Sequence, residues 1–130
     1  MKRFLSLALV ALLLTGCAAP AASGSFRQVS AREAISMMEE EKDYIILDVR
    51  TPEEYAQAHI PGAINIPNET IADRPPEQLP DKEALILVYC RSGNRSKQAS
   101  RKLAAMGYTS IVEFGGINSW PGETVSGSDA

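Results

Sequence analysis

Residues 85–96 read LILVYCRSGNRS, an apolar run that passes directly into a short polar segment. Residues 85–89 form the most apolar of the predicted strands, which favours a central place in a sheet. Residues 96–106 are predicted to form a helix, because Ala99, Leu103 and Met106 repeat at the spacing of one helical face. Gly107 is placed to end that helix in a left-handed conformation. The stretch therefore predicts a buried strand, a tight loop and a helix.

The alternation of strands and helices continues on both sides of this stretch. Ser30 with Glu33, and Thr51 with Glu54, form two capping boxes that open predicted helices. Strands that alternate with helices are typical of an α/β protein, with a mainly parallel sheet covered by helices on both faces. The other predicted strands are 26–29, 44–49, 64–66 and 110–114, the capped helices are 31–40 and 52–58, residues 71–81 are a loop, and a short helix closes the domain before Trp120.

The loop after the central strand carries the residues most suited to chemistry. Cys90 stands at the carboxyl end of the strand, where ligands bind in open α/β sheets. Gly93 allows the positive φ that a tight curl needs, and Asn94 tolerates that region better than most residues. Backbone N–H groups of such a loop, with Arg91 and Arg95, favour a thiolate, which is the nucleophilic form of cysteine. The alternative is a small, inert core cysteine.

Five stretches carry a resemblance to a known family. They are ILDVR at 46–50, EEY at 53–55, HIPGAINIP at 59–67, YCRSGNRS at 89–96 and FGGINSW at 114–120. In this order, across residues 26–125, they resemble the single-domain rhodanese (sulfurtransferase) family. The resemblance implies a five-stranded, mainly parallel sheet with helices on both sides, and a persulfide carried by one cysteine.

The resemblance also implies roles for individual residues. Cys90 would attack a sulfane sulfur, for instance of thiosulfate or a persulfide donor, and would pass it to a thiol, or to cyanide in the test tube. The reaction would need neither a metal ion nor an organic cofactor. The loop that lines the sulfur would comprise Arg91, Ser92, Gly93, Asn94, Arg95 and Ser96.

Three other functions remain open at this point. Related phosphatases place five residues between the cysteine and the arginine of the loop, whereas four separate Cys90 from Arg95, so a phosphatase or arsenate reductase is a runner-up. A catalytically idle rhodanese-like module that recruits a partner is a second alternative. A redox protein is a third, although it would lack a resolving cysteine.

Residues outside the loop have structural interpretations beside functional ones. Asp48 and Arg50 end a predicted strand next to the site, and we expect an ion pair that braces neighbouring loops in preference to an acid–base pair. His59, the single histidine, is expected to close the helix that starts after Thr51. Trp120 is expected to be a lid or core residue near the site. The family often has glycine directly before the histidine that His59 matches, and Ala58 stands there instead.

The first 25 residues indicate export. Residues 1–16 have a positive start and a short apolar run, as in a signal peptide. The apolar run is too short to span a bilayer as a helix. The sequence LTGC at 14–17 resembles a bacterial lipobox, which implies cleavage before Cys17, a lipid on its sulfur and attachment to the cell envelope. Residues 18–25 would be a flexible tether. Ala18 would suit the periplasmic face of the outer membrane in a Gram-negative cell.

The composition of the chain bears on the number of domains and on possible partners. The chain has 130 residues, 22% charged and 45% hydrophobic, with a net charge of −3. These values favour one folded domain, expected over residues 26–125 with a tail at 126–130. No basic stripe is present, which argues against nucleic acid as a partner. A monomer is the default for so small a domain.

Overall fold

The computed structural model describes residues 25–128, so the predicted signal peptide and Cys17 lie outside the described residues. One five-stranded sheet with strand order β1-β5-β4-β2-β3 forms its centre, and every strand pair is parallel. The strands are β1 (Arg27–Gln28), β2 (Ile45–Asp48), β3 (Ile64–Asn65), β4 (Ile86–Cys90) and β5 (Ile111–Gly116). β4 is the middle strand, which confirms the prediction from its apolar sequence.

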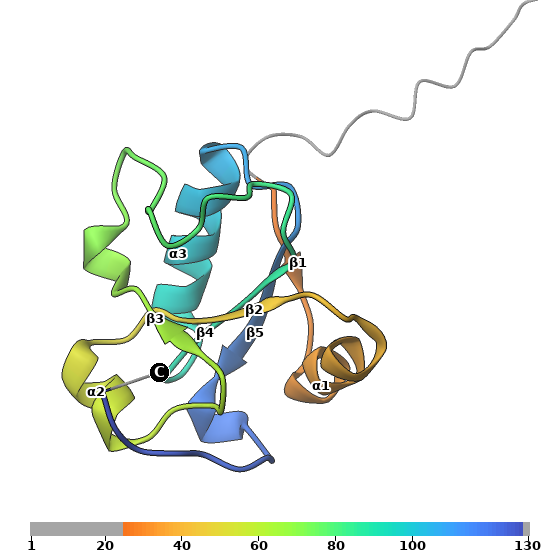
Figure 1. Ribbon diagram of the computed structural model, residues 1–130, viewed down its shortest axis with the longest axis vertical. Helices are drawn as coiled ribbons and strands as arrows, with labels where there is room; N and C mark the ends of the chain where they lie inside the picture. Colours follow the sequence, from red (N-terminus) through yellow and green to blue (C-terminus); the bar gives the residue numbers. More distant parts are fainter. Residues whose placement is uncertain (1–24, 129–130) are drawn as a thin grey trace, which may run out of the picture.

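Helices cover both faces of the sheet, as predicted (Figure 1). α1 lies on one side of the sheet and α3 on the other. The helices are α1 (Ala31–Glu40), α2 (Pro52–Gln57) and α3 (Asn94–Ala105), with 3₁₀ turns η1 (Asn68–Thr70) and η2 (Ile117–Ser119). Within residues 25–128 no helix is both long and apolar enough to cross a membrane.

The helix caps form as the sequence predicts. The Ser30 hydroxyl accepts the Glu33 N–H over 3.1 Å at the start of α1. Thr51 and Glu54 exchange side-chain and backbone hydrogen bonds at the start of α2, where Pro52 occupies the first turn. Gly107, with φ +98°, ends α3 in the left-handed conformation.

Each face of the sheet has its own apolar core. Strand residues alternate between the faces, so Val88 and Cys90 pack with α3 while Leu87 and Tyr89 pack on the opposite side with α1. At the end of the domain, Val125 forms an antiparallel bridge with His59, and the Gly127 N–H donates to the Ala56 carbonyl over 2.8 Å. The predicted tail is therefore held against α2 as far as Gly127.

Candidate active site

Cys90 is the last residue of β4, and the residue is 1% exposed. The β4–β5 register shifts between Val88 and Cys90, which sets Cys90 opposite Gly116. This close approach requires glycine, because a Cβ at position 116 would lie 2.0 Å from the Arg91 carbonyl oxygen. The two strand ends and the loop thus enclose the sulfur.

The loop is shorter than the sequence predicts. α3 begins at Asn94, two residues before the predicted start at Ser96. Gly93 adopts φ +115°, which confirms the positive φ predicted for it, and turns the chain directly into the helix. Asn94 does not share that conformation, since no residue other than glycine has a positive φ within residues 25–128. It is instead the first residue of α3.

Hydrogen bonds converge on the sulfur of Cys90. The Gly93 N–H donates to Sγ over 3.0 Å, and Sγ lies 3.4 Å from the Ser96 hydroxyl oxygen. Burial raises the pKa of the Cys90 thiol, but hydrogen bonds from Ser96 and from backbone N–H groups of the loop outweigh it. The net effect lowers the pKa below its usual value, so the loop stabilises the thiolate.

The two arginines of the loop differ in their surroundings. Arg91 is exposed. Arg95 is half-buried, and its guanidinium forms two hydrogen bonds with the Glu54 carboxylate, of 2.6 Å and 3.0 Å. Glu54 raises the pKa of Arg95, and the nearby Cys90 adds to this effect. Sequence reasoning missed this contact because it assigned Glu54 only to the cap of α2.

Glu113 of β5 is a second residue that sequence reasoning missed. The residue is 3% exposed, and its Oε1 accepts hydrogen bonds from the Ser96 hydroxyl over 2.7 Å and the Gly115 N–H over 2.8 Å. Ser96 is fully buried between this carboxyl group and Cys90. The sequence signal was a single acidic residue inside an apolar strand.

Asp48 and Arg50 form the predicted ion pair. Their closest atoms are 2.7 Å apart and both side chains are buried. Arg50 also donates to the Ala58 carbonyl over 2.6 Å, and Tyr89 donates to Asp48 over 2.7 Å. Tyr89 in turn accepts the Ile60 N–H. This network ties β2 and β4 to the segment after α2, and a supporting role in the reaction stays a prediction.

His59 and Trp120 are parts of the packing. The His59 ring stacks on Tyr55 with centroids 3.8 Å apart, and its Nδ1 is 2.8 Å from the Tyr55 carbonyl oxygen at the end of α2. This geometry confirms the predicted structural role. Trp120 is partly buried. It packs against Phe114 at the edge of the core on the sheet face opposite the Cys90 side chain, and its Nε1 donates to the Glu123 carbonyl.

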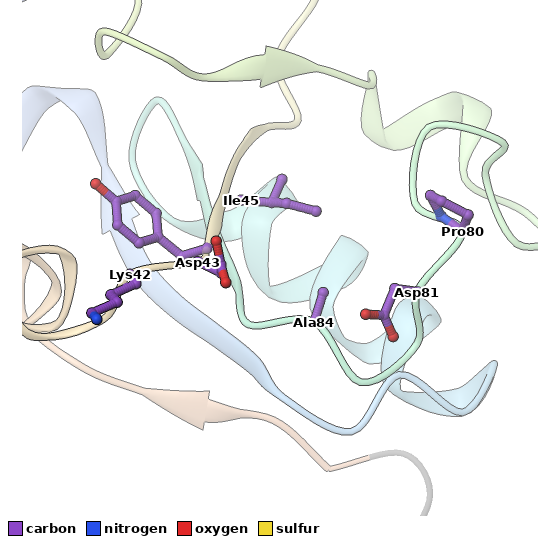
Figure 2. Close-up of a pocket in the computed structure, with 7 residues that line it drawn as sticks. Lys42, Asp43, Ile45, Pro80, Asp81 and Ala84 are labelled. Carbon is purple, nitrogen blue, oxygen red and sulfur yellow. The ribbon is translucent and has the colours of Figure 1, made fainter.

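Two of the cavities within residues 25–128 lie at opposite ends of the strands. A pocket of about 420 Å³ adjoins the amino ends of β2 and β4 (Figure 2). Cys90 is at the other end of β4. The pocket is lined by Lys42, Asp43, Tyr44, Ile45, Pro80, Asp81 and Ala84. The other cavity, of about 510 Å³, adjoins the active-site loop at Ser92 and includes Arg32 and Gly116. The second cavity lies at the carboxyl ends of the strands and borders the loop at Ser92, although Cys90 itself does not line it.

The fold and the loop together define an α/β protein with an activated thiol at a strand end. A model of the rhodanese-like domain family matches residues 30–123. The chain therefore belongs to the rhodanese-like family, and it is a rhodanese-type sulfurtransferase.

Two curated relatives show how far the similarity extends. Thiosulfate sulfurtransferase PspE of Escherichia coli is 45% identical over 71 residues, which cover 55% of this chain and 68% of the relative. Thiosulfate sulfurtransferase GlpE of Pseudomonas entomophila is 32% identical over 108 residues, which cover 79% of this chain and 95% of the relative.

Solved structures show the same fold. An E. coli rhodanese solved with anions matches with a TM-score of 0.60 and 40% identity, covering 65% of this chain and 99% of the other. The Alr3790 protein from Anabaena matches with a TM-score of 0.68 and 31% identity, covering 76% and 80%. These matches confirm the predicted rhodanese-like fold.

Proposed function

We propose that Cys90 is the nucleophile of a two-step sulfur transfer from a small donor such as thiosulfate. The Cys90 thiolate attacks the sulfane sulfur, the bond from that sulfur to the sulfite group breaks, and sulfite leaves with the bonding electrons. Cys90 then carries a persulfide anion. An acceptor thiolate, or cyanide, attacks the outer sulfur, and the Cys90 thiolate is released with the electrons of the sulfur–sulfur bond.

One observation carries this proposal, namely that the loop stabilises negative charge on the Cys90 sulfur. The Gly93 N–H lies 3.0 Å from Sγ, and the hydrogen bonds lower the pKa of the thiol despite burial. Backbone N–H groups held in place before the reaction stabilise developing charge without reorganisation. The same groups would stabilise the outer sulfur of a persulfide.

The surroundings of the sulfur favour a small anionic donor. Cys90 is 1% exposed, so a bulky substrate would have to displace the loop. Ser92 of the loop lines a cavity of about 510 Å³, and the exposed Arg32 of α1 lines it too. This cavity is our candidate approach for the donor and for a thiol acceptor, which would reach Cys90 past Ser92 because Cys90 itself does not line the cavity. The relatives' names favour transfer of sulfur over the phosphatase, redox and partner-recruiting alternatives.

Mass spectrometry of the intact protein tests the persulfide. The wild-type chain is mixed with thiosulfate, freed of excess donor and weighed. We expect a gain of one sulfur atom, which cyanide removes and which Cys90→Ser does not acquire. The control is Ser100→Ala, which changes a buried serine of α3 outside the loop. A wild-type protein that gains no sulfur from thiosulfate or polysulfide, although its thiol is alkylated readily, would refute the mechanism.

We also propose that Cys17 carries the lipid that LTGC at 14–17 predicts, which would hold the domain at the cell envelope. Lipidation can be measured by labelling cells with a fatty acid analogue and by fractionating membranes. We expect label and membrane association in the wild type and neither in Cys17→Ala. A Cys17→Ala protein that stays in the membrane fraction would contradict the anchor.

A further inference from the structure

Glu113 is a buried carboxyl group beneath the active-site loop that the proposed reaction leaves unused. It is 3% exposed, and neither of the two ion pairs within residues 25–128 includes it. Its Oε1 has two donors, the Gly115 N–H at 2.8 Å and the Ser96 hydroxyl at 2.7 Å. Burying a carboxylate without a cation is costly. The two hydrogen bonds are therefore the support that this carboxyl group has in the buried site.

Ser96 joins this carboxyl group to the sulfur. Its oxygen is 2.7 Å from Glu113 Oε1 and 3.4 Å from Cys90 Sγ, and it is completely buried. A serine hydroxyl has one proton to donate and two lone pairs that accept. The Gly93 carbonyl at 2.9 Å also competes for that proton, but a charged carboxylate is the stronger acceptor.

The arrangement of these three groups fits two protonation states. With Glu113 ionised, Ser96 donates to the carboxylate, and its lone pair accepts the S–H of the Cys90 thiol. With Glu113 protonated, the carboxyl O–H donates to Ser96, and Ser96 donates to the Cys90 thiolate. The heavy atoms need not move between the two states. Each state holds one negative charge, which avoids two anions close together in a buried site.

We propose that Glu113 stores the proton of Cys90 and exchanges it through Ser96. The Cys90 S–H bond breaks as its proton bonds to Ser96 Oγ, and the former Ser96 proton bonds to Glu113 Oε1. The electron pair of the S–H bond stays on the sulfur, which becomes the thiolate. Glu113 is thus a positioning residue that acts on Cys90 through Ser96. The inference rests on the proposed role of Cys90 as the nucleophile.

Other charged groups surround the three residues. Arg95 acts electrostatically on Cys90 and is paired with Glu54 of α2. On the opposite sheet face, Asp48 and Arg50 pair with each other. The remaining charged residues on the elements packed against β5 are Arg27 of β1, Arg32, Glu33, Glu39 and Glu40 of α1, Arg91 of the loop, and Lys97, Arg101 and Lys102 of α3. All of them stay the same in the variants below, so differences between variants report on Glu113 and Ser96.

The test is the rate at which iodoacetamide alkylates Cys90 as a function of pH, without any sulfur donor. Peptide mass spectrometry of the full chain separates Cys90 from Cys17. Because two coupled groups lose protons in two macroscopic steps, we expect a two-step profile in the wild type. In Glu113→Gln we expect a single step at lower pH, with about tenfold faster alkylation on the acid side, which corresponds to roughly one pKa unit. The amide cannot take the proton, and it places no negative charge beside Cys90.

A double-mutant cycle separates the route through Ser96 from a direct effect of charge. In Ser96→Ala, we expect Glu113→Gln to change the profile by less than half as much as it does when the hydroxyl is present. An equal change in both backgrounds would overturn the relay, since the carboxyl group would then act through space. A single-step wild-type profile would also overturn it, and that measurement requires no variant to fold. A missing persulfide would refute the proposed function and leave these profiles to decide the relay.

Discussion

The ion pair between Glu54 and Arg95 joins α2 to the first turn of α3, next to the active-site loop. Glu54→Gln removes its charge with little change in shape. Glutamine is also accepted at this position of a capping box, so the cap with Thr51 should survive. The variant therefore isolates the contact with Arg95, whose hydrogen bonds measure 2.6 Å and 3.0 Å.

The size of the effect follows from the pKa of Glu54. Hydrogen bonds from Arg95 are the main cause that lowers this pKa from 4.5 to about 2. A change of this size corresponds to about 3 kcal/mol at roughly 1.4 kcal/mol per pKa unit. The two side chains are 28% and 26% exposed, and solvent screening of such a pair reduces the expected value to about 1–2 kcal/mol.

The sign of the pH dependence is fixed by the lowered pKa. The folded protein binds a proton at Glu54 more weakly than the unfolded chain does. The stabilisation is therefore fully present above about pH 4.5 and is lost as pH falls through the interval from 4.5 to about 2. Glu54→Gln should lack this part of the acid sensitivity.

Urea unfolding of both proteins at several pH values between 2 and 7 measures the difference. We expect the wild type to be more stable by about 1–2 kcal/mol at pH 7 and the two proteins to converge near pH 2. High salt should reduce the difference at pH 7, because the pair is partly exposed. A difference that stays constant over the whole pH range would refute the assignment to the carboxylate, and equal stability at pH 7 would refute the magnitude.

Two further substitutions examine the packing around the site. Asp48→Asn should lower the free energy of unfolding by about 3–5 kcal/mol, because it leaves the buried charge of Arg50 without its partner; a loss below about 1 kcal/mol in urea unfolding would contradict this. Gly116→Ala should lower the free energy of unfolding by about 1–3 kcal/mol or more and slow the alkylation of Cys90, because the new Cβ would lie 2.0 Å from the Arg91 carbonyl oxygen. Unchanged alkylation in a folded Gly116→Ala protein would show that the strand and loop separate freely.

The features that were predictable from the sequence depend on neighbouring residues. The caps at Ser30 and Thr51, and the end of α3 at Gly107, are formed by residues a few positions apart. The central place of β4 follows from an uninterrupted apolar run, and all five residues of the strand are buried. Such signals act before the chain has folded, so the sequence alone displays them.

The features that were missed depend on contacts between distant residues. Glu54 and Arg95 are 41 positions apart, and Ser96 and Glu113 are 17 apart. Each of these side chains also has a local explanation, as a cap residue, a helix residue or a polar residue in a strand. Only the packing of α3 on β5 and the position of α2 give them their second role. The start of α3 was misplaced for a related reason, because Gly93 alone makes the turn, and Asn94, which was expected in the loop, already belongs to the helix.

Successive side chains of β4 point to opposite faces of the sheet, which separates the reactive residue Cys90 from the residues that hold the strand in place. Tyr89 and Cys90 are adjacent in the chain and point to opposite faces of the sheet. Tyr89 binds Asp48 and the Ile60 N–H, and so fixes β4 against its neighbours. Cys90 faces α3, Ser96 and the loop amides. Because the two contact sets share only the strand, changes on the Tyr89 face should act on stability, whereas changes on the Cys90 face should alter the charge and reactivity of the sulfur.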